Sequence, residues 1–148
     1  MADNTPQITV DEEPTPLTIE RVAELFKAVG FNYELDNGRI KTGFGQIPMA
    51  IYLDGNNDFL VIRGFWWANL DERGKAIANS VISEKHSKTF FPTYFVFEDE
   101  DGFQIAGDVN MFVGAGGVTD AQLGSYVGFF EMLEKELNDV AEAVTKGL

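Results

Sequence analysis

The segment from Asp58 to Trp67 constrains the fold most, because both of its faces are apolar. Alternate side chains of an extended strand point to opposite sides of the sheet. Leu60, Ile62 and Trp66 therefore share one face. The opposite face carries Phe59, Val61, Arg63, Phe65 and Trp67. Because such a strand needs cover on both sides, we expect helices of the chain on one face and a partner surface on the face that holds Arg63.

Length, charge and composition exclude several classes of protein. The 148 residues suit one domain with a single core. The chain has no cysteine, which excludes disulfides, thiolate metal sites and thiol nucleophiles. A formal net charge of -13 repels a phosphate backbone, so we expect no nucleic-acid binding. The chain shows neither a secretory signal nor the run of roughly 20 apolar residues that a membrane helix needs, so we expect a cytoplasmic protein without membrane contact.

The first 16 residues differ in composition from the rest of the chain. They contain Pro6, Pro14 and Pro16, the acidic cluster Asp11–Glu13, and few large apolar side chains. Such a segment has little surface to bury. We therefore expect residues 1–16 to form a disordered acidic tail and residues 17–146 to form a single domain.

The domain is expected to begin with a helix and a hairpin. Thr18 is a suitable N-cap, and apolar residues recur at helical spacing up to Val29. Gly30 is a suitable stop for this helix. Asn37 and Gly38 then form a typical hairpin turn between two short extended segments.

The pattern of the next hundred residues predicts an α+β fold. The periodicity predicts strands over residues 47–53, 93–97 and 103–113, and a helix from Asn69 to about Lys85–Lys88. Asn69 with Glu72 three residues later is typical of a capping box. A single antiparallel sheet with helices on one face, in the order α-βββ-α-ββ-α with three or four strands before the second helix, satisfies this pattern.

The final helix has two apolar sides. Thr119, with Gln122 at capping-box spacing, opens it. Its main stripe comprises Leu123, Tyr126, Val127, Phe130, Leu133, Leu137, Val140 and Val144. Gly124, Gly128 and Met132 belong to a second, flatter side. Because a helix with two apolar sides lies between two surfaces, we expect these three residues to form a tight helix contact, either inside the domain or at the interface of a homodimer.

Residues that carry chemistry in enzymes are scarce in this chain. The only histidine, His86, lies at an expected helix end, where a solvated role is usual. The acidic turn Glu98–Asp101 lacks the spacing of an EF-hand loop. The connector Gly114–Gly117 lacks the Gly-Lys-Ser or Gly-Lys-Thr ending of a phosphate loop. We therefore predict no catalytic residue, no bound metal and no cofactor.

The face of the central strand that holds Arg63 is the candidate binding site. Phe59, Arg63, Phe65 and Trp67 combine aromatic rings with one arginine, as binding hot spots do. The neighbouring strands are expected to add Tyr52, Gln104, Asp108, Asn110 and Phe112. In the alternative, Arg63 pairs with an acid such as Asp108, and loops or a dimer mate cover the aromatic rings.

Several segments resemble one known family. They are LTIERVAELFKAVGFNYELDNGRIKTGF, the strand LVIRGFWW, the VISEKHS region, and TYFVFEDEDGFQIAGDVNMFV before a long final helix. Over about residues 17–137 the chain is similar to the YbjN domain family, whose members are proposed bacterial sensory transduction regulators. The family is similar in fold to type III secretion chaperones. The resemblance implies a dimeric α+β protein that holds partner segments, and it brings no catalytic residues with it.

Together these observations predict a non-enzymatic protein-binding module, a chaperone-like or regulatory adaptor that forms a homodimer. A protein or peptide partner would lie across the sheet around Trp67, with Phe65 and Phe59 as anchors and Arg63 fixing its polarity. The alternative is a sensor that binds a small apolar or anionic ligand between the sheet and the final helix.

Overall fold

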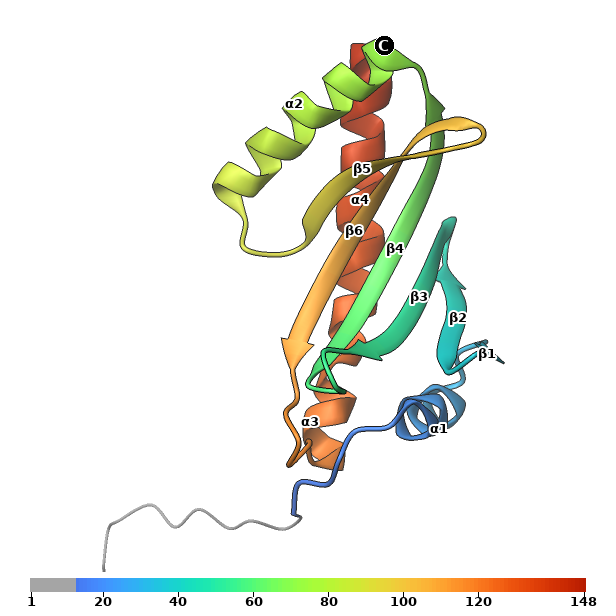
Figure 1. The fold of residues 1–148 in the computed structure, drawn as a ribbon, viewed down its shortest axis with the longest axis vertical. Coiled ribbons are helices and arrows are strands. Elements are labelled where there is room, and N and C mark those ends of the chain that lie inside the picture. Colours follow the sequence, from blue (N-terminus) through green and yellow to red (C-terminus); the bar gives the residue numbers. More distant parts are fainter. Residues whose placement is uncertain (1–12) are drawn as a thin grey trace, which may run out of the picture.

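A computed structural model describes residues 13–148 and contains one antiparallel sheet of six strands (Figure 1). The strands lie side by side in the order β1-β2-β3-β4-β6-β5. The elements are α1 (Ile19–Val29), β1 (Glu34–Asp36), β2 (Arg39–Phe44), β3 (Ile47–Asp54), β4 (Phe59–Leu70), α2 (Glu72–Lys88), β5 (Thr93–Asp99), β6 (Gly102–Phe112), α3 (Asp120–Ser125) and α4 (Val127–Gly147). This order confirms the predicted α+β class. Four strands precede α2, because the short β1 is present in addition to the three longer ones.

The strand predicted to be central lies inside the sheet. β4 is 12 residues long and pairs with β3 over Phe59–Gly64. On its other side β4 pairs with β6 over Phe59–Trp66. The two hydrogen-bonded neighbours hold both edges of β4, so the side chains on each of its faces have fixed positions relative to those of β3 and β6.

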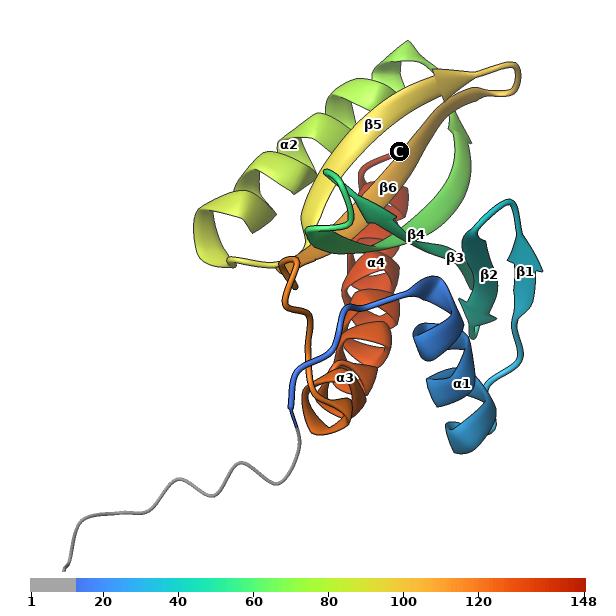
Figure 2. The ribbon, with the colours of Figure 1, turned by 60° about the horizontal axis from the view of Figure 1, so that its bottom comes forward.

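The helices cover one face of the sheet and leave the other bare, as Figure 1 and Figure 2 show. We call the covered face the inner face and the bare face the outer face. Leu60 and Ile62 of β4 point inward and are 1% and 0% exposed. Gly64 lets α4 lie close to this strand, because a Cβ atom at Gly64 would lie 2.6 Å from Cδ1 of Leu137. The core therefore fills the space between the sheet and the helices.

Four phenylalanines join α1, the first hairpin and α4. Phe130 is 1% exposed, and its ring centroid lies 5.1 Å from that of Phe26 and 5.5 Å from that of Phe44. Phe31 packs edge-on against Phe26 and Phe44. The first of the two expected extended segments is short, because Phe31 enters this cluster and β1 begins only at Glu34.

Several local predictions are confirmed. The side chain of Thr18 caps α1. Asn37 and Gly38 both have positive φ angles, 52° and 75°, which suits the tight turn between β1 and β2. Thr119 and Gln122 form a complete capping box at the start of α3.

The predicted capping box at the start of the second helix is wrong. The N-cap of α2 is Asp71, whose carboxylate accepts a hydrogen bond from the Gly74 backbone N–H at 2.8 Å. Asn69 instead belongs to β4 and has a φ of 50°. Its backbone N–H donates to Oε1 of Gln104, and its side-chain oxygen accepts from Nε2 of the same residue. This contact with β6 takes the asparagine away from the helix.

The single final helix that the sequence predicts is divided in two. α3 ends at Ser125 and α4 begins at Val127. The backbone N–H of Tyr126 donates to the carbonyl of Leu123 at 3.1 Å, a three-residue turn that is tighter than an α-helical one. The two helices therefore share the predicted apolar stripe across a break.

The start of the described chain is attached to the loop before α3. Thr15 and Val118 form an antiparallel bridge with two backbone hydrogen bonds of 3.2 and 3.0 Å. Arg21 donates to the carbonyl oxygens of both residues at 2.7 and 3.0 Å. Residues 1–12, the larger part of the predicted acidic tail, lie outside the described residues.

Candidate functional site

The outer face of the sheet contains the predicted binding residues. Phe59, Arg63, Phe65 and Trp67 all lie on it, because they alternate along β4 with the inward-pointing core residues. No helix lies over this face in either view of the fold (Figures 1 and 2). Trp67 is 50% exposed and Phe59 is 43% exposed. Phe112 of β6, opposite Phe59, is 71% exposed.

Arg63 and Asp108 form a bidentate ion pair in the middle of this face. Nε and Nη2 of Arg63 each donate to one carboxylate oxygen of Asp108, both at 2.7 Å. The hydrogen bond to Asp108 raises the pKa of Arg63 above its ordinary value. The Asp108 side chain is 11% exposed and that of Arg63 is 30% exposed, so the pair is largely removed from water. The pairing of Arg63 with Asp108, which the alternative to the binding hypothesis contained, is therefore present.

Aromatic clusters lie on both sides of this ion pair. On one side, the rings of Phe65 and Trp67 are stacked, with centroids 5.0 Å apart. Phe97 of β5 meets both rings edge-on, at 6.3 and 5.8 Å. On the other side, the rings of Phe59 and Phe112 lie 5.6 Å apart. Two separated apolar areas with a polar centre between them are suited to an elongated partner.

The sequence analysis missed the contribution of β5. Phe95 and Phe97 reach the outer face because they pair with Ala106 and Gln104 of β6. The guanidinium carbon of Arg63 lies 4.9 Å from the centroid of the Phe95 ring. The sequence contained one signal for this contribution, the alternating phenylalanines of a predicted strand next to an acidic hairpin turn. The register of β5 with β6 was needed to place them on this face.

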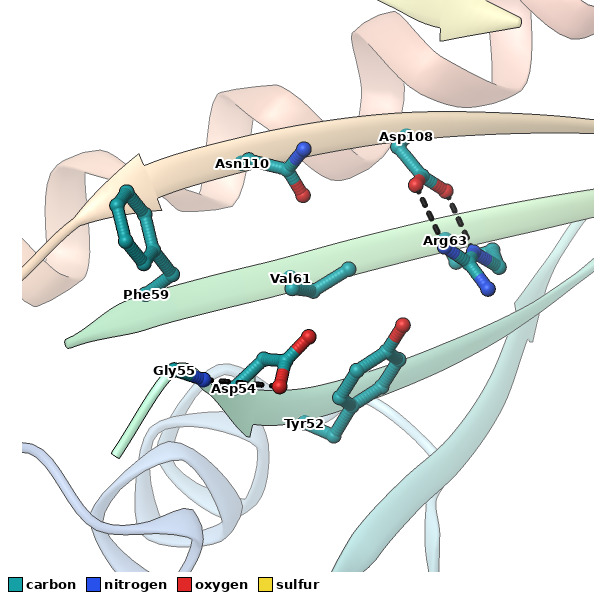
Figure 3. Close-up of a pocket in the computed structure, with 8 residues that line it drawn as sticks. All are labelled: Tyr52, Asp54, Gly55, Phe59, Val61, Arg63, Asp108 and Asn110. Carbon is teal, nitrogen blue, oxygen red and sulfur yellow. Dashed lines mark hydrogen bonds and ion pairs between the residues drawn. The ribbon is translucent and has the colours of Figure 1, made fainter. Parts of the chain in front are cut away.

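A polar pocket of about 380 Å³ lies between the ion pair and the Phe59 end of the outer face (Figure 3). Its lining residues are Tyr52, Asp54, Gly55, Phe59, Val61, Arg63, Asp108 and Asn110. In Figure 3, Tyr52 and Asp54 extend from β3 toward β4, and Asn110 extends toward β4 from the opposite side. Buried Val61 lies between them. The pocket thus has aromatic walls, an apolar floor and several polar groups directed inward.

A second, more apolar groove lies on the other side of the ion pair. It has a volume of about 330 Å³ and is lined by Arg39, Lys41, Thr42, Pro48, Met49, Ala50, Phe65 and Trp67. The pairing of β3 with β4 ends at Met49 and Gly64, so Pro48 lies beyond the last paired residue. Proline lacks the N–H that a ladder needs. The groove therefore forms where the two strands separate.

The residues predicted for a dimer interface lie on the helical side of the molecule. Gly124 and Met132 are half-buried, and Gly128 is exposed. A Cβ atom at either glycine would meet no other atom within 4 Å. Neither glycine therefore makes a close helix contact within the described part of the chain, which leaves a contact with a second copy as a proposal.

His86 and Tyr94 form a contact that the sequence analysis did not foresee. His86 is exposed in the last turn of α2, as expected. Its Nε2 atom accepts a hydrogen bond from the Tyr94 backbone N–H at 2.9 Å. The Tyr94 hydroxyl is buried without a hydrogen-bond partner among the described residues, and burial raises the pKa of this hydroxyl. The histidine thus attaches the start of β5 to α2, which is a structural role.

Three further observations on the described residues concern metal binding, the alternative ligand site and membrane spans. Residues 13–148 contain no group of three or more His, Cys, Asp and Glu side chains that suits a metal ion. Buried side chains of Leu133, Leu137, Val140 and Val144 occupy the region between the sheet and α4, where the alternative hypothesis places a ligand. Within the same residues, no helix combines the length and the apolar character needed to cross a membrane.

Comparison with known proteins supports the fold. No protein-family model matches the chain, and a search of curated proteins finds no similar sequence. Among solved structures, the crystal structure of YbjN from E. coli, a proposed transcription regulator, is similar with a TM-score of 0.73. The alignment covers 91% of this chain and 97% of that chain at 12% sequence identity. At this identity the likeness concerns the fold alone, and it confirms the fold that the YbjN resemblance implies.

Proposed function

We propose that this chain is a non-enzymatic, protein-binding adaptor of YbjN type, which holds an extended or helical segment of its partner across the outer face. The observation that carries the proposal is the uncovered outer face itself. Phe59, Trp67 and Phe112 are 43%, 50% and 71% exposed. They lie on one side of a sheet whose other side packs against the core. Exposed aromatic residues around a central arginine are typical of binding surfaces.

The shape of this face favours a polypeptide partner over a small molecule. The polar pocket and the apolar groove are both shallow and lie along the same strand, on either side of Arg63. A small ligand is normally enclosed on most of its surface. An extended chain or a helix, in contrast, contacts several shallow depressions in a row.

Replacing Trp67 with alanine tests this proposal. We expect the variant to keep its fold and to lose about 1 kcal/mol or less of unfolding free energy, because half of the side chain is already exposed. Peptides selected from a random display library on the wild-type protein should bind the variant at least about tenfold more weakly. Affinities are measured by fluorescence anisotropy, and folding by circular dichroism.

Phe90→Ala is the matched control for this experiment. Phe90 is 87% exposed but lies in the loop between α2 and β5, outside the strands of the sheet. Its replacement should leave the affinities unchanged. Equal affinities of wild type and Trp67→Ala for every selected peptide would contradict the proposal, and so would unfolding of the Trp67 variant.

We also propose that the chain forms a homodimer through the exposed side of α3 and α4. Gly124 and Gly128 face open space, and Met132 is half-buried beside them, so a second copy has room to approach closely. Gly128→Arg should convert a dimer into a folded monomer, because a Cβ atom has open space at this position and the long charged side chain would enter the interface. Light scattering measures the mass. A wild-type monomer, or a variant that remains dimeric, would contradict this interface.

A further inference from the structure

The polar pocket contains a second carboxylate besides Asp108, that of Asp54, whose charge helps to raise the pKa of Arg63. Arg63 balances Asp108 through the bidentate pair. Asp54, which is exposed, accepts a hydrogen bond from the Gly55 backbone N–H at 2.8 Å and forms no ion pair with any described residue. The Tyr52 hydroxyl and the Asn110 amide make no hydrogen bond within residues 13–148, and both side chains extend toward the space above Val61 (Figure 3). These groups can each accept a hydrogen bond, and they surround a site that Arg63 also lines.

This chemistry suits the side chain of a lysine or an arginine. A carboxylate with neutral acceptors beside it stabilises an ammonium or guanidinium group. The Phe59 ring offers cation–π contact, whereas the Tyr52 ring already has the guanidinium groups of Arg39 and Arg63 over it. Buried Val61 can pack against the aliphatic stem. An anionic group would instead face Asp54. The formal charge of -13 on the whole chain also favours basic partners.

The apolar groove suits a different side chain. Its floor and walls are formed largely by Pro48, Ala50, Phe65 and Trp67, which favour an apolar group. Arg39 at its rim stacks on the Tyr52 ring, 4.4 Å from the centroid, and pairs with no carboxylate among the described residues. A second basic side chain would be repelled there. The two depressions therefore differ in the residue that they accept.

The register of the sheet fixes the distance between the two depressions. The polar pocket lies over Val61 and the groove lies beside Phe65, four residues further along β4. Four residues of an extended strand span about 13 Å, and in an extended partner segment side chains four residues apart also point to the same side. We infer that the outer face recognises an extended segment with a lysine or arginine and a large apolar residue four positions apart. This inference rests on the proposed function and specifies the partner's chemistry.

Defined peptides test the inference. The probe is a nine-residue peptide of serine and threonine with arginine at its third position and phenylalanine at its seventh. The comparison peptides replace the arginine with glutamine or aspartate, or move the arginine to the fourth position. Titrations are followed by the ¹⁵N–¹H shifts of the Val61 and Phe65 amides, which report affinity and location. We expect the first peptide to bind at least about tenfold more tightly than each of the others.

Asp54→Asn identifies the carboxylate that binds the basic group. The asparagine oxygen can still accept from the Gly55 N–H, so the turn is preserved. We expect about tenfold weaker binding of the arginine peptide and no change for the glutamine peptide. Glu24→Gln is the matched control, because Glu24 is exposed on α1 and its replacement alters the net charge equally. Its affinity for the arginine peptide should equal that of the wild type.

The outcomes separate this inference from the proposed function. Equal binding of the arginine and glutamine peptides, or an Asp54→Asn variant that binds as tightly as wild type, would overturn the basic site. Equal binding of the shifted peptide would overturn the spacing. If displayed peptides of other composition bind the outer face while the designed peptide does not, the inference fails and the proposed function stands. If no peptide perturbs the outer face, both fail.

Discussion

Phe130→Ala should lower the free energy of unfolding by about 3–5 kcal/mol, the usual cost of removing a fully buried phenylalanine. The ring is 1% exposed and contacts Phe26, Phe31 and Phe44, which come from α1, the segment before β1, and β2. The alanine would leave a cavity where these elements meet α4. Urea unfolding followed by circular dichroism measures the loss, and the melting temperature should fall by on the order of 10 °C.

Phe129→Ala provides the comparison within the same helix. Phe129 is only half-buried, and its ring has one tilted contact, with Tyr126, at 6.2 Å. Its removal should cost clearly less than the removal of Phe130, because little enclosed volume is created. Similar losses for the two variants would mean that the four-phenylalanine cluster does not hold α1 and the first hairpin to α4.

The fold was largely predictable because its determinants are local. The two apolar faces of residues 58–67 required an interior strand, and the caps Thr18 and Thr119 set the starts of α1 and α3. The boundary before α2 was not predictable in this way. Asn69 looks like a cap in the sequence, but it pairs with Gln104, which is 1% exposed and 35 residues distant. A contact between strands outweighed the local preference for a helix cap.

The candidate site was predictable only in part, for a related reason. The alternation along β4 was sufficient to place Arg63, Phe65 and Trp67 on one face. Phe95 reaches that face through the register of a neighbouring hairpin. Asp54 faces the polar pocket because β3 ends beside the start of β4. Periodicity within one segment assigns faces, whereas pockets depend on the alignment of several strands.

Arg63→Met should lower the free energy of unfolding by about 2–3 kcal/mol, near the lower end of the range for broken buried pairs. The variant deprives the Asp108 carboxylate, whose side chain is 11% exposed in the wild type, of both hydrogen bonds. The loss stays moderate because the Arg63 side chain is 30% exposed, so some water can reach the site. Lys41→Met is the control: it breaks an equally short pair with Asp36, but the two side chains are 58% and 41% exposed. The control should lose clearly less stability than Arg63→Met, because water screens an exposed pair.

The double variant Arg63→Met with Asp108→Leu determines what the ion pair contributes. Two apolar residues of similar size remove both charges together, so the unfolding free energy should return to within about 1 kcal/mol of the wild-type value. A double variant as unstable as Arg63→Met alone would mean that the pair itself holds β4 to β6. If stability is restored, the pair is not required for folding. Its position between two exposed aromatic clusters is then better explained by recognition of a partner. A fixed arginine on an otherwise apolar surface determines the register in which a partner segment can bind.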